Sequence, residues 1–173
     1  MHKSTLVLMV FLGLFAAAPA LADSQLDIGV NVPGWAGVSI DGERVTEQIP
    51  FRIPIPDLMY NYFFDVGPVK LGGGARVWTL IIATGAYPIL SAEFETKRLV
   101  LNAHVGGLVF GYLTPFPNGS GIETGRVFLP EISAAFRLTD WFSLGVAGLG
   151  VRVPELTDGL GYVINVFGRF RVR

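Results

Sequence analysis

Apolar residues recur at every second position along most of the chain, which is the period of a β-strand and not of a helix. In the final segment, Tyr162, Ile164 and Val166 fall on one face, whereas Asn165 and Arg169 fall on the other. Four further segments alternate in the same way: 26–32, 69–77, 88–96 and 128–138. The pattern predicts an all-β protein.

Two stretches with almost no charge resemble membrane helices in hydropathy alone. No residue between Arg76 and Glu93 is charged, and residues 99–122 contain His104 as their one titratable side chain other than tyrosine. Glycines and prolines interrupt both stretches: Gly85, Pro88, Gly106, Gly107, Gly111, Pro115 and Pro117. So many helix-breaking residues, with few helix formers between them, favour strands over helices.

Turn-forming residues divide the chain into strands. Short polar connections occur at 65–68, 95–98 and 139–140, and longer ones at 41–57, 83–87, 113–124 and 154–159. The two kinds alternate, which predicts eight antiparallel strands near 25–40, 58–65, 69–82, 88–96, 98–112, 125–137, 141–152 and 160–172. An even up-and-down order, with short turns at one end and long loops at the other, is the plan of a transmembrane β-barrel of the outer-membrane type.

The aromatic residues form two groups in this arrangement. One group lies near the short turns: Phe63, Phe64, Phe94, Phe136, Trp141, Phe142 and Phe170. The other lies near the long loops: Trp35, Trp78, Tyr87, Tyr112, Phe128 and Tyr162. Aromatic rings concentrate where lipid headgroups meet hydrocarbon, so the two groups are expected to be membrane-interface belts. They favour a membrane barrel over a water-soluble one, whose apolar positions would face inward.

Residues 1–22 have the layout of a cleavable secretory signal. A basic residue precedes an apolar stretch over residues 6–15, and Ala20 and Ala22 are small residues of the kind that signal peptidase accepts. The stretch is too short for a stable membrane-spanning helix. We therefore expect a signal peptide at 1–22 and a mature barrel domain at 23–173.

Composition narrows the classes of function. Hydrophobic residues make up 51% of the 173 residues, and 13 basic against 14 acidic residues give a formal net charge of −1. There is no basic excess with which to bind nucleic acid. Cysteine is absent, which excludes disulfides, cysteine nucleophiles and thiolate metal sites. The mature chain has a single histidine, His104, so we expect no metal site and no cofactor.

The mature chain resembles the small eight-stranded outer-membrane barrels of diderm bacteria, of the OmpA-transmembrane, OmpX and OmpW type. The resemblance rests on the passage AFRLTDWFSLG at 135–145 and on the alternating last strand at 162–172. The chain departs from the family pattern at Arg173, where an aromatic residue is usual. The resemblance implies an outer-membrane location, contact with membrane lipid and lipopolysaccharide, and folding by the barrel-assembly machinery that reads the last strand.

If the apolar positions face lipid, the charged positions face the lumen. They comprise Asp27, Asp65, Lys70, Arg76, Glu93, Glu95, Glu131, Arg137, Arg169 and Arg171. Because buried charges are costly unless they are paired, we expect an ion-pair network that fills the barrel. Arg76 with Glu93 and Asp27 with Arg171 are the expected pairs. The alternative is a narrow gated channel lined by the same charges, since eight strands leave room for side chains or one small ligand.

His104, Ser133 and Glu131 are the weak candidates for catalysis. All three are expected to point inward on neighbouring strands, and they are the parts of a nucleophilic triad. No Gly-x-Ser-x-Gly motif is present in the sequence. We therefore expect no enzyme, with a lipid A-modifying hydrolase or acyltransferase as the alternative.

The first long loop is rich in proline. Prolines at 50, 54 and 56 alternate with four apolar residues: Ile49, Phe51, Ile53 and Ile55. Proline has no backbone N–H, so the segment is predicted to be extended and not to form a regular central strand. Its apolar side chains either cover the barrel mouth and touch lipid or form a loop surface that binds a partner.

Together these patterns predict a non-enzymatic outer-membrane protein that anchors surface loops for envelope integrity or adhesion. A narrow channel for small or apolar solutes, as the OmpW type implies, is the first alternative. A lipid-modifying enzyme is the second, and a soluble lipocalin-like periplasmic barrel is the third.

Overall fold

The computed structural model describes residues 23–40, 43–49, 53–80, 83–115, 120–125, 127–152 and 160–172. The strands in these ranges are β1 (Asp23–Ile40), β2 (Glu43–Gln48), β3 (Ile55–Val66), β4 (Val69–Leu80), β5 (Ala83–Glu95), β6 (Leu99–Gly106), β7 (Val109–Leu113), β8 (Gly121–Thr124), β9 (Leu129–Arg137), β10 (Phe142–Val151) and β11 (Leu160–Val172). No helix in the described ranges is long and apolar enough to span a membrane. The predicted secretory signal lies outside the described residues.

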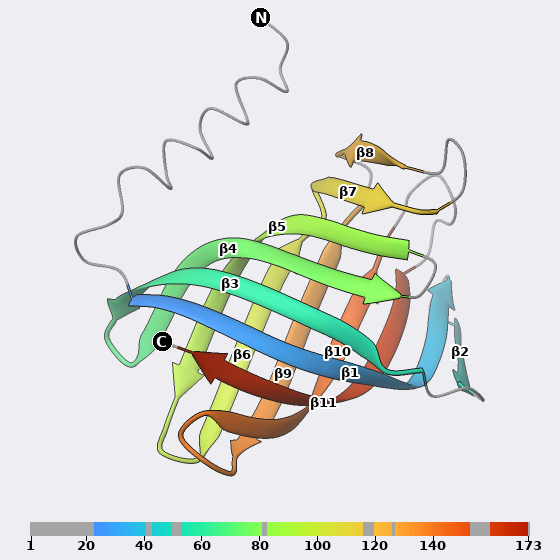
Figure 1. The fold of residues 1–173 in the computed structure, drawn as a ribbon. Helices are drawn as coiled ribbons and strands as arrows, with labels where there is room; N and C mark the ends of the chain where they lie inside the picture. Colours follow the sequence, from blue (N-terminus) through green and yellow to red (C-terminus); the bar gives the residue numbers. More distant parts are fainter. Residues whose placement is uncertain are drawn as a thin grey trace, which may run out of the picture.

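Eight of the described strands close into an antiparallel barrel. They pair in the order β4-β3-β1-β11-β10-β9-β6-β5, and β4 also pairs with β5, which completes the ring. The first and last strands of the ring join from Leu26 opposite Val172 to Ser39 opposite Leu160. Figure 1 shows the strands wrapped around a common axis. The predicted all-β, eight-stranded up-and-down barrel is confirmed.

Three short turns lie at one end of the ring, as predicted. They join β3 to β4, β5 to β6, and β9 to β10. In the last turn, the backbone N–H of Leu138 donates to the carbonyl of Phe142 at 2.9 Å. The start of β1 and the end of β11 lie at this turn end, whereas β2, β7 and β8 lie at the opposite, loop end (Figure 1).

The strands reach further toward the loop end than the sequence predicted. The segment 83–87, expected to be a loop, is the start of β5 and pairs with β4 as far as Leu80 opposite Ala83. The expected loops 41–57 and 113–124 contain β2 and β8, which pair with β1 and β7. Small residues such as Gly85 suggested a loop, but the β4–β5 ladder continues through Trp78 opposite Gly85, because tertiary pairing overrides weak local preference.

The strand predicted at 98–112 is divided into β6 and β7. Gly107, between them, has a φ of 92°, a conformation that glycine adopts without strain. Across this point the register with β5 changes from Ile89 opposite Gly106 to Ala86 opposite Gly111. The extra residues form a bulge that redirects the chain. As a result, β7 and β8 extend the sheet from β5 beyond the ring.

Side chains alternate between an apolar outer wall and a mostly polar interior. On the outer wall, Leu90, Phe136 and Ile164 are 62%, 48% and 39% exposed, while Ser91 and Asn165, next to them in sequence, are buried. This orientation is the one predicted, and it is the inverse of that in a water-soluble barrel.

The predicted aromatic belts are correct only in part. At the turn end, Trp141 stacks on Phe170 with ring centroids 5.4 Å apart, and Phe142 lies 4.8 Å from Phe170. Phe63 and Tyr87, however, are buried in the interior. The reason is strand alternation: Phe63 lies two residues from the buried Asn61 and therefore shares its inward face.

Glycines let β3 and β4 approach closely. A Cβ on Gly74 would lie 1.7 Å from the carbonyl oxygen of Tyr60, and one on Gly72 would lie 2.0 Å from that of Tyr62. A Cβ on Gly73, whose position faces the outer wall, would meet nothing nearer than 3.4 Å. Only glycine therefore fits at the two inward positions, where the wall bends sharply.

Apolar side chains occupy the loop end of the interior. Met59, Tyr87, Ile89 and Leu129 are buried together, and five partly buried residues pack against them: Trp78, Phe110, Val127, Leu149 and Val151. A second buried group, Val100, Ala135, Ala147 and Phe167, lines the side formed by β6, β9, β10 and β11. Val100 lies opposite Glu95, so the second group reaches the turn end beside the polar site described next.

Candidate functional site

The interior of the barrel contains most of the buried polar side chains of the described residues. Strand alternation turns them inward from β1, β3, β4, β5, β6, β9 and β11: Gln25, Asp27, Asn31, Asp57, Asn61, Arg76, Ser91, Glu93, Asn102, His104, Glu131, Ser133, Asn165 and Arg169. Charges removed from water need partners. The function of the interior therefore depends on which of these groups pair with one another.

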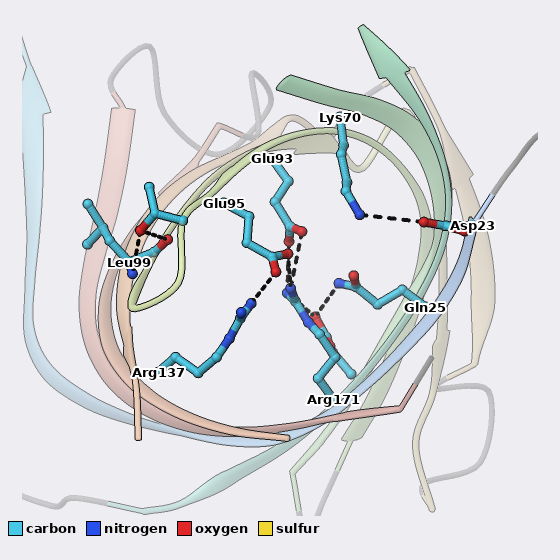
Figure 2. Close-up of polar contacts among 10 residues, drawn as sticks. Asp23, Gln25, Lys70, Glu93, Glu95, Leu99, Arg137 and Arg171 are labelled. Atoms are coloured by element: carbon cyan, nitrogen blue, oxygen red, sulfur yellow. Dashed lines mark hydrogen bonds and ion pairs between the residues drawn. The ribbon is translucent and has the colours of Figure 1, made fainter. Parts of the chain in front are cut away.

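The charged group nearer the turn end is centred on Arg171, and we call it the Arg171 cluster (Asp27, Glu93, Glu95, Arg137 and Arg171). The Arg171 guanidinium donates to Asp27 through Nε at 2.9 Å and Nη2 at 3.2 Å. It also donates to Glu93 Oε2 at 2.8 Å and to Glu95 Oε2 at 3.3 Å. Arg137 Nη2 lies 2.6 Å from Glu95 Oε1. Figure 2 shows Glu93, Glu95, Arg137 and Arg171 converging inside the ring of strands.

The edge of the Arg171 cluster is completed by two further contacts. Gln25 Nε2 donates to Asp27 Oδ2 at 3.0 Å. Lys70 Nζ lies 3.6 Å from Asp23 Oδ2 at the turn-end rim, where the Asp23 side chain is largely exposed (Figure 2). An ion pair open to water contributes little to stability, so Lys70 belongs to the rim and not to the buried network.

A second charged group lies deeper and is centred on Arg76; we call it the Arg76 cluster (Asp57, Arg76, Glu131 and Arg169). Arg76 binds Asp57 with two parallel hydrogen bonds, Nε to Oδ1 at 2.8 Å and Nη2 to Oδ2 at 2.9 Å. Its third donor, Nη1, reaches Glu131 Oε2 at 2.6 Å. Such bidentate pairing is the strong geometry for a buried guanidinium.

Two further side chains contact the carboxylate of Asp57. Asn31 Nδ2 donates to Asp57 Oδ2 at 3.1 Å, and Arg169 Nη2 lies 3.6 Å from that oxygen. The Arg169 guanidinium also sits 4.6 Å from the centre of the Phe167 ring, a cation–π contact. Asp57 therefore links β1, β3, β4 and β11 across the interior.

A hydrogen-bonded chain crosses the interior on β3, β5 and β6. Ser91 Oγ donates to Asn61 Oδ1 at 2.8 Å, and His104 Nδ1 lies 2.9 Å from Ser91 Oγ. Because the serine proton is given to Asn61, the matching tautomer has His104 donating through Nδ1. The role of His104 here is that of a packed polar residue.

The three candidate catalytic residues do not form a triad. His104 lies opposite Glu131 in the β6–β9 ladder, and Ser133 lies opposite Asn102. Glu131 is bound by Arg76, and no hydrogen bond to Ser133 Oγ is formed within the described part of the chain. The serine that His104 contacts is Ser91. Pleat direction placed the candidates inside correctly, but it could not show which pairs touch.

The predicted pairs have different outcomes. Asp27 with Arg171 is confirmed. Arg76 with Glu93 is wrong, since Tyr87 is the β5 residue opposite Arg76 and Glu93 binds Arg171.

Asp65 was expected in the lumen and is exposed at the turn-end terminus of β3. The buried acid on β3 is instead Asp57, which lies at the end of the predicted loop 41–57. Alternation would have found it: Asp57, Met59, Asn61 and Phe63 form one inward face.

The proline-rich segment is only partly described. Ile49 is half-buried, with its N–H donating to the carbonyl of Gly34 at 3.0 Å. Ile53 is exposed, and Ile55 begins β3 opposite Asn31. Phe51 lies outside the described residues. Pro56 pairs with Val30 of β1 and precedes the first β4 partner of β3, so it sits where β3 is still an edge strand.

No group of three or more His, Asp or Glu residues in the described ranges is placed to hold a metal ion. The nearest approach to a carboxylate site is Asp27, Glu93 and Glu95, and Arg171 bonds to all three. The described charged side chains of the interior form ion pairs and hydrogen bonds with one another.

No protein-family model matches the chain, and no curated protein matches its sequence. Solved structures do match. The N-terminal β-barrel domain of OprF from Pseudomonas aeruginosa is 10% identical over 87% of this chain and 99% of that domain, with a TM-score of 0.50. Neisserial surface protein A is 9% identical over 86% and 97%, with a TM-score of 0.46. Ail of Yersinia pestis is 13% identical over 88% and 99%, with a TM-score of 0.43.

The likeness to the OprF domain, over 87% of this chain, shows the fold alone. It agrees with the closure of β4 on β5 and with the apolar outer wall. This chain has the fold of the small eight-stranded outer-membrane β-barrels.

Proposed function

We propose that the chain is an integral outer-membrane protein whose closed barrel conducts nothing and anchors the loop-end strands β2, β7 and β8 at the membrane surface. The observation that carries the proposal is that the barrel wall separates apolar side chains on its outside from charged side chains on its inside. Apolar residues cover its outer surface, while the charged residues inside are buried and paired. Such a cylinder is stable only when hydrocarbon surrounds it.

The packing of the interior supports a closed barrel over a channel. Met59, Ile89 and Asn61 are among the side chains that are buried almost completely. Asp27, Glu93 and Glu131, the acids that would line a channel, are equally buried. A solute path would have to break the bidentate Arg76–Asp57 contact and the three-way contact of Arg171. Eight strands enclose a volume that side chains can fill, and the burial of these residues supports a filled interior.

The surroundings of His104 support a non-enzymatic role. His104, Ser133 and Glu131 lie inside the wall, where a lipid substrate has no route to them. We propose surface-loop presentation, in envelope integrity or adhesion, as the role of the loop end. The contacts this requires are with membrane lipid and lipopolysaccharide, and folding requires the barrel-assembly machinery, for which β11 is the candidate signal.

Two measurements test the proposal. A folded barrel resists SDS and migrates differently in a gel before and after boiling, and we expect this shift. In planar lipid bilayers the purified protein is expected to give no conductance steps. A protein that is extracted without detergent would refute the membrane placement. Steps that disappear in Glu93→Ala and Arg76→Ala variants would establish the channel alternative instead.

The enzymatic alternative has its own test. Mass spectrometry of lipid A from cells with and without the protein is expected to give the same profile. A changed profile that His104→Ala restores would refute the non-enzymatic proposal.

A further inference from the structure

The β7–β8 hairpin has an outer face that continues the outer wall of the barrel. Gly111 of β7 lies between Ala86 of β5 and Ile122 of β8 in the ladder. Ala86 is four residues from Leu90, which is exposed on the outer wall, so Ile122 shares that face. Leu113 lies opposite Thr84, two residues from Ala86, and belongs to the same face.

The inner face of the hairpin is already occupied. Phe110 stacks on Tyr87 with ring centroids 5.8 Å apart and lies 6.1 Å from Trp78. Tyr112 continues the row, 6.4 Å from Phe110. These aromatic rings cover the apolar group at the loop end of the interior. The hairpin is therefore held against the barrel by one face, and its aliphatic face is directed outward.

The outer face carries no charge. Its described positions on β7 and β8 are Val109, Gly111, Leu113, Ile122 and Thr124. Ile122 is 73% exposed and Leu113 is 65% exposed, as high as residues in the middle of the outer wall. Glu123 alternates with Ile122 and so belongs to the inner face. An exposed apolar surface of this kind, continuous with a membrane wall, matches the chemistry of lipid.

We propose that the outer face of β7–β8 lies against the bilayer, with Leu113 and Ile122 in contact with acyl chains. This inference rests on the proposed function, since it requires the barrel to be in a membrane. The expected depth is the boundary between headgroups and hydrocarbon. Among the described residues β8 pairs with β7 and lies at the end of the strand order, and the edge of a sheet requires water or headgroups for its backbone polar groups. The hydroxyls of Thr84 and Thr124 on the same face suit that depth.

The β2 strand, on the other side of the loop end, provides a matched control. Val45 of β2 is 63% exposed and apolar, like Ile122. It lies opposite Val38, which in turn lies opposite Gly161, four residues from the buried Asn165. Val45 therefore lies on the face that continues the inner wall, and we expect it to face water.

Site-specific labelling tests the inference directly, because the chain has no cysteine. The variants Ile122→Cys, Leu113→Cys, Val45→Cys and Leu90→Cys are each labelled with an environment-sensitive fluorophore. The labelled proteins are folded into phosphatidylcholine vesicles. Quenching by lipids that carry a nitroxide, either near the headgroup or in the middle of the acyl chain, is compared with quenching by aqueous iodide.

We expect the labels at 122 and 113 to be quenched several-fold more by the nitroxide near the headgroup than by iodide, and the label at 45 to show the reverse. A label at 122 that behaves like the label at 45 would refute the inference. Protection of the 122 label from both quenchers would also refute it, since the hairpin would then be covered by protein, such as a second copy.

The label at 90 separates this inference from the proposed function. If it is not quenched by nitroxide lipids, the barrel wall is not in the membrane and the proposed function fails. If the label at 90 is quenched by nitroxide lipids while the label at 122 is quenched only by iodide, the barrel is in the membrane. In that case only the proposed contact between the β7–β8 hairpin and lipid is refuted. The gel shift on boiling confirms that each variant is folded.

Discussion

Asp27 on β1 and Arg171 on β11 are joined by two hydrogen bonds, of 2.9 and 3.2 Å, although 144 positions separate them in the sequence. They lie directly opposite each other where the first and last strands of the ring meet. The same guanidinium reaches Glu93 and Glu95 on β5. One side chain therefore ties the closing seam to a strand on another part of the wall.

Removing this guanidinium is expected to destabilise the barrel strongly. Arg171→Met keeps most of the side-chain volume but leaves three carboxylates without their shared partner, and loss of one member of a buried network costs about 3–5 kcal/mol. Urea unfolding in detergent micelles, followed by tryptophan fluorescence, measures the loss. Lys97→Met, at an exposed turn position, is the control and should leave the midpoint nearly unchanged. Equal effects of the two substitutions would contradict the central role of Arg171.

Two aspartates of β3 are expected to respond very differently to the same substitution. Asp57→Asn removes the charge that Arg76 binds with two hydrogen bonds and is expected to cost about 3 kcal/mol. Asp65→Asn, at an exposed position, is expected to change stability by less than about 0.5 kcal/mol. The same unfolding measurement compares them. A larger effect at Asp65 would mean that the Arg76 cluster is misassigned.

Adjacent glycines of β4 give a test of wall curvature. Gly74→Ala places a Cβ 1.7 Å from the carbonyl oxygen of Tyr60, so β3 and β4 must separate, and we expect a loss of roughly 3 kcal/mol or more. Gly73→Ala meets its nearest atom at 3.4 Å and should fold normally. The fraction of protein that shows the gel shift on boiling reports the difference. Normal folding of both variants would show that β3 and β4 do not approach each other closely at Gly74.

Processing of the N-terminus is a prediction from sequence alone. The protein recovered from outer membranes is expected to begin at Asp23, because Ala20 and Ala22 suit signal peptidase. Intact mass spectrometry measures the mature N-terminus directly. Ala22→Arg should block cleavage and leave the precursor, and a mature start at another residue would correct the boundary.

The fold was readable from the sequence because a membrane wall imposes a strict rule on every strand. One face must be apolar, so Leu90, Phe136 and Ile164 marked the outer wall without any knowledge of their neighbours. The short turns were readable for a similar reason: polar residues such as those at 139–140 interrupt the alternation. The strands β2 and β8 were missed, because at the loop end that rule is relaxed and backbone pairing decides instead.

The interior shows the limit of the same reasoning. Alternation assigns a residue to the inside, as it did for Asp27, Glu93 and Arg171. It gives no information on where the side chain lies along the barrel axis or on its angular position around that axis. Which acid meets which base depends on the stagger of the strands and on the length of each side chain. Arg76 therefore binds Asp57 and Glu131 rather than Glu93. The two ends of β3 also differ in burial: Asp65, beside the β3–β4 turn, is exposed, whereas Asp57, near the loop end, is buried with Arg76 and Asn31 bound to it.

The amino-acid sequence by itself determined the class of structure, the number of strands in the ring and the faces of the wall, because those follow from the two-residue period and from the solvent that each face must meet. Only the tertiary structure decided the pairing of charges, the close approach at Gly74 and the outward aliphatic face of β7–β8. These depend on contacts between residues far apart in the chain, whose relative positions are set by strand register and stagger.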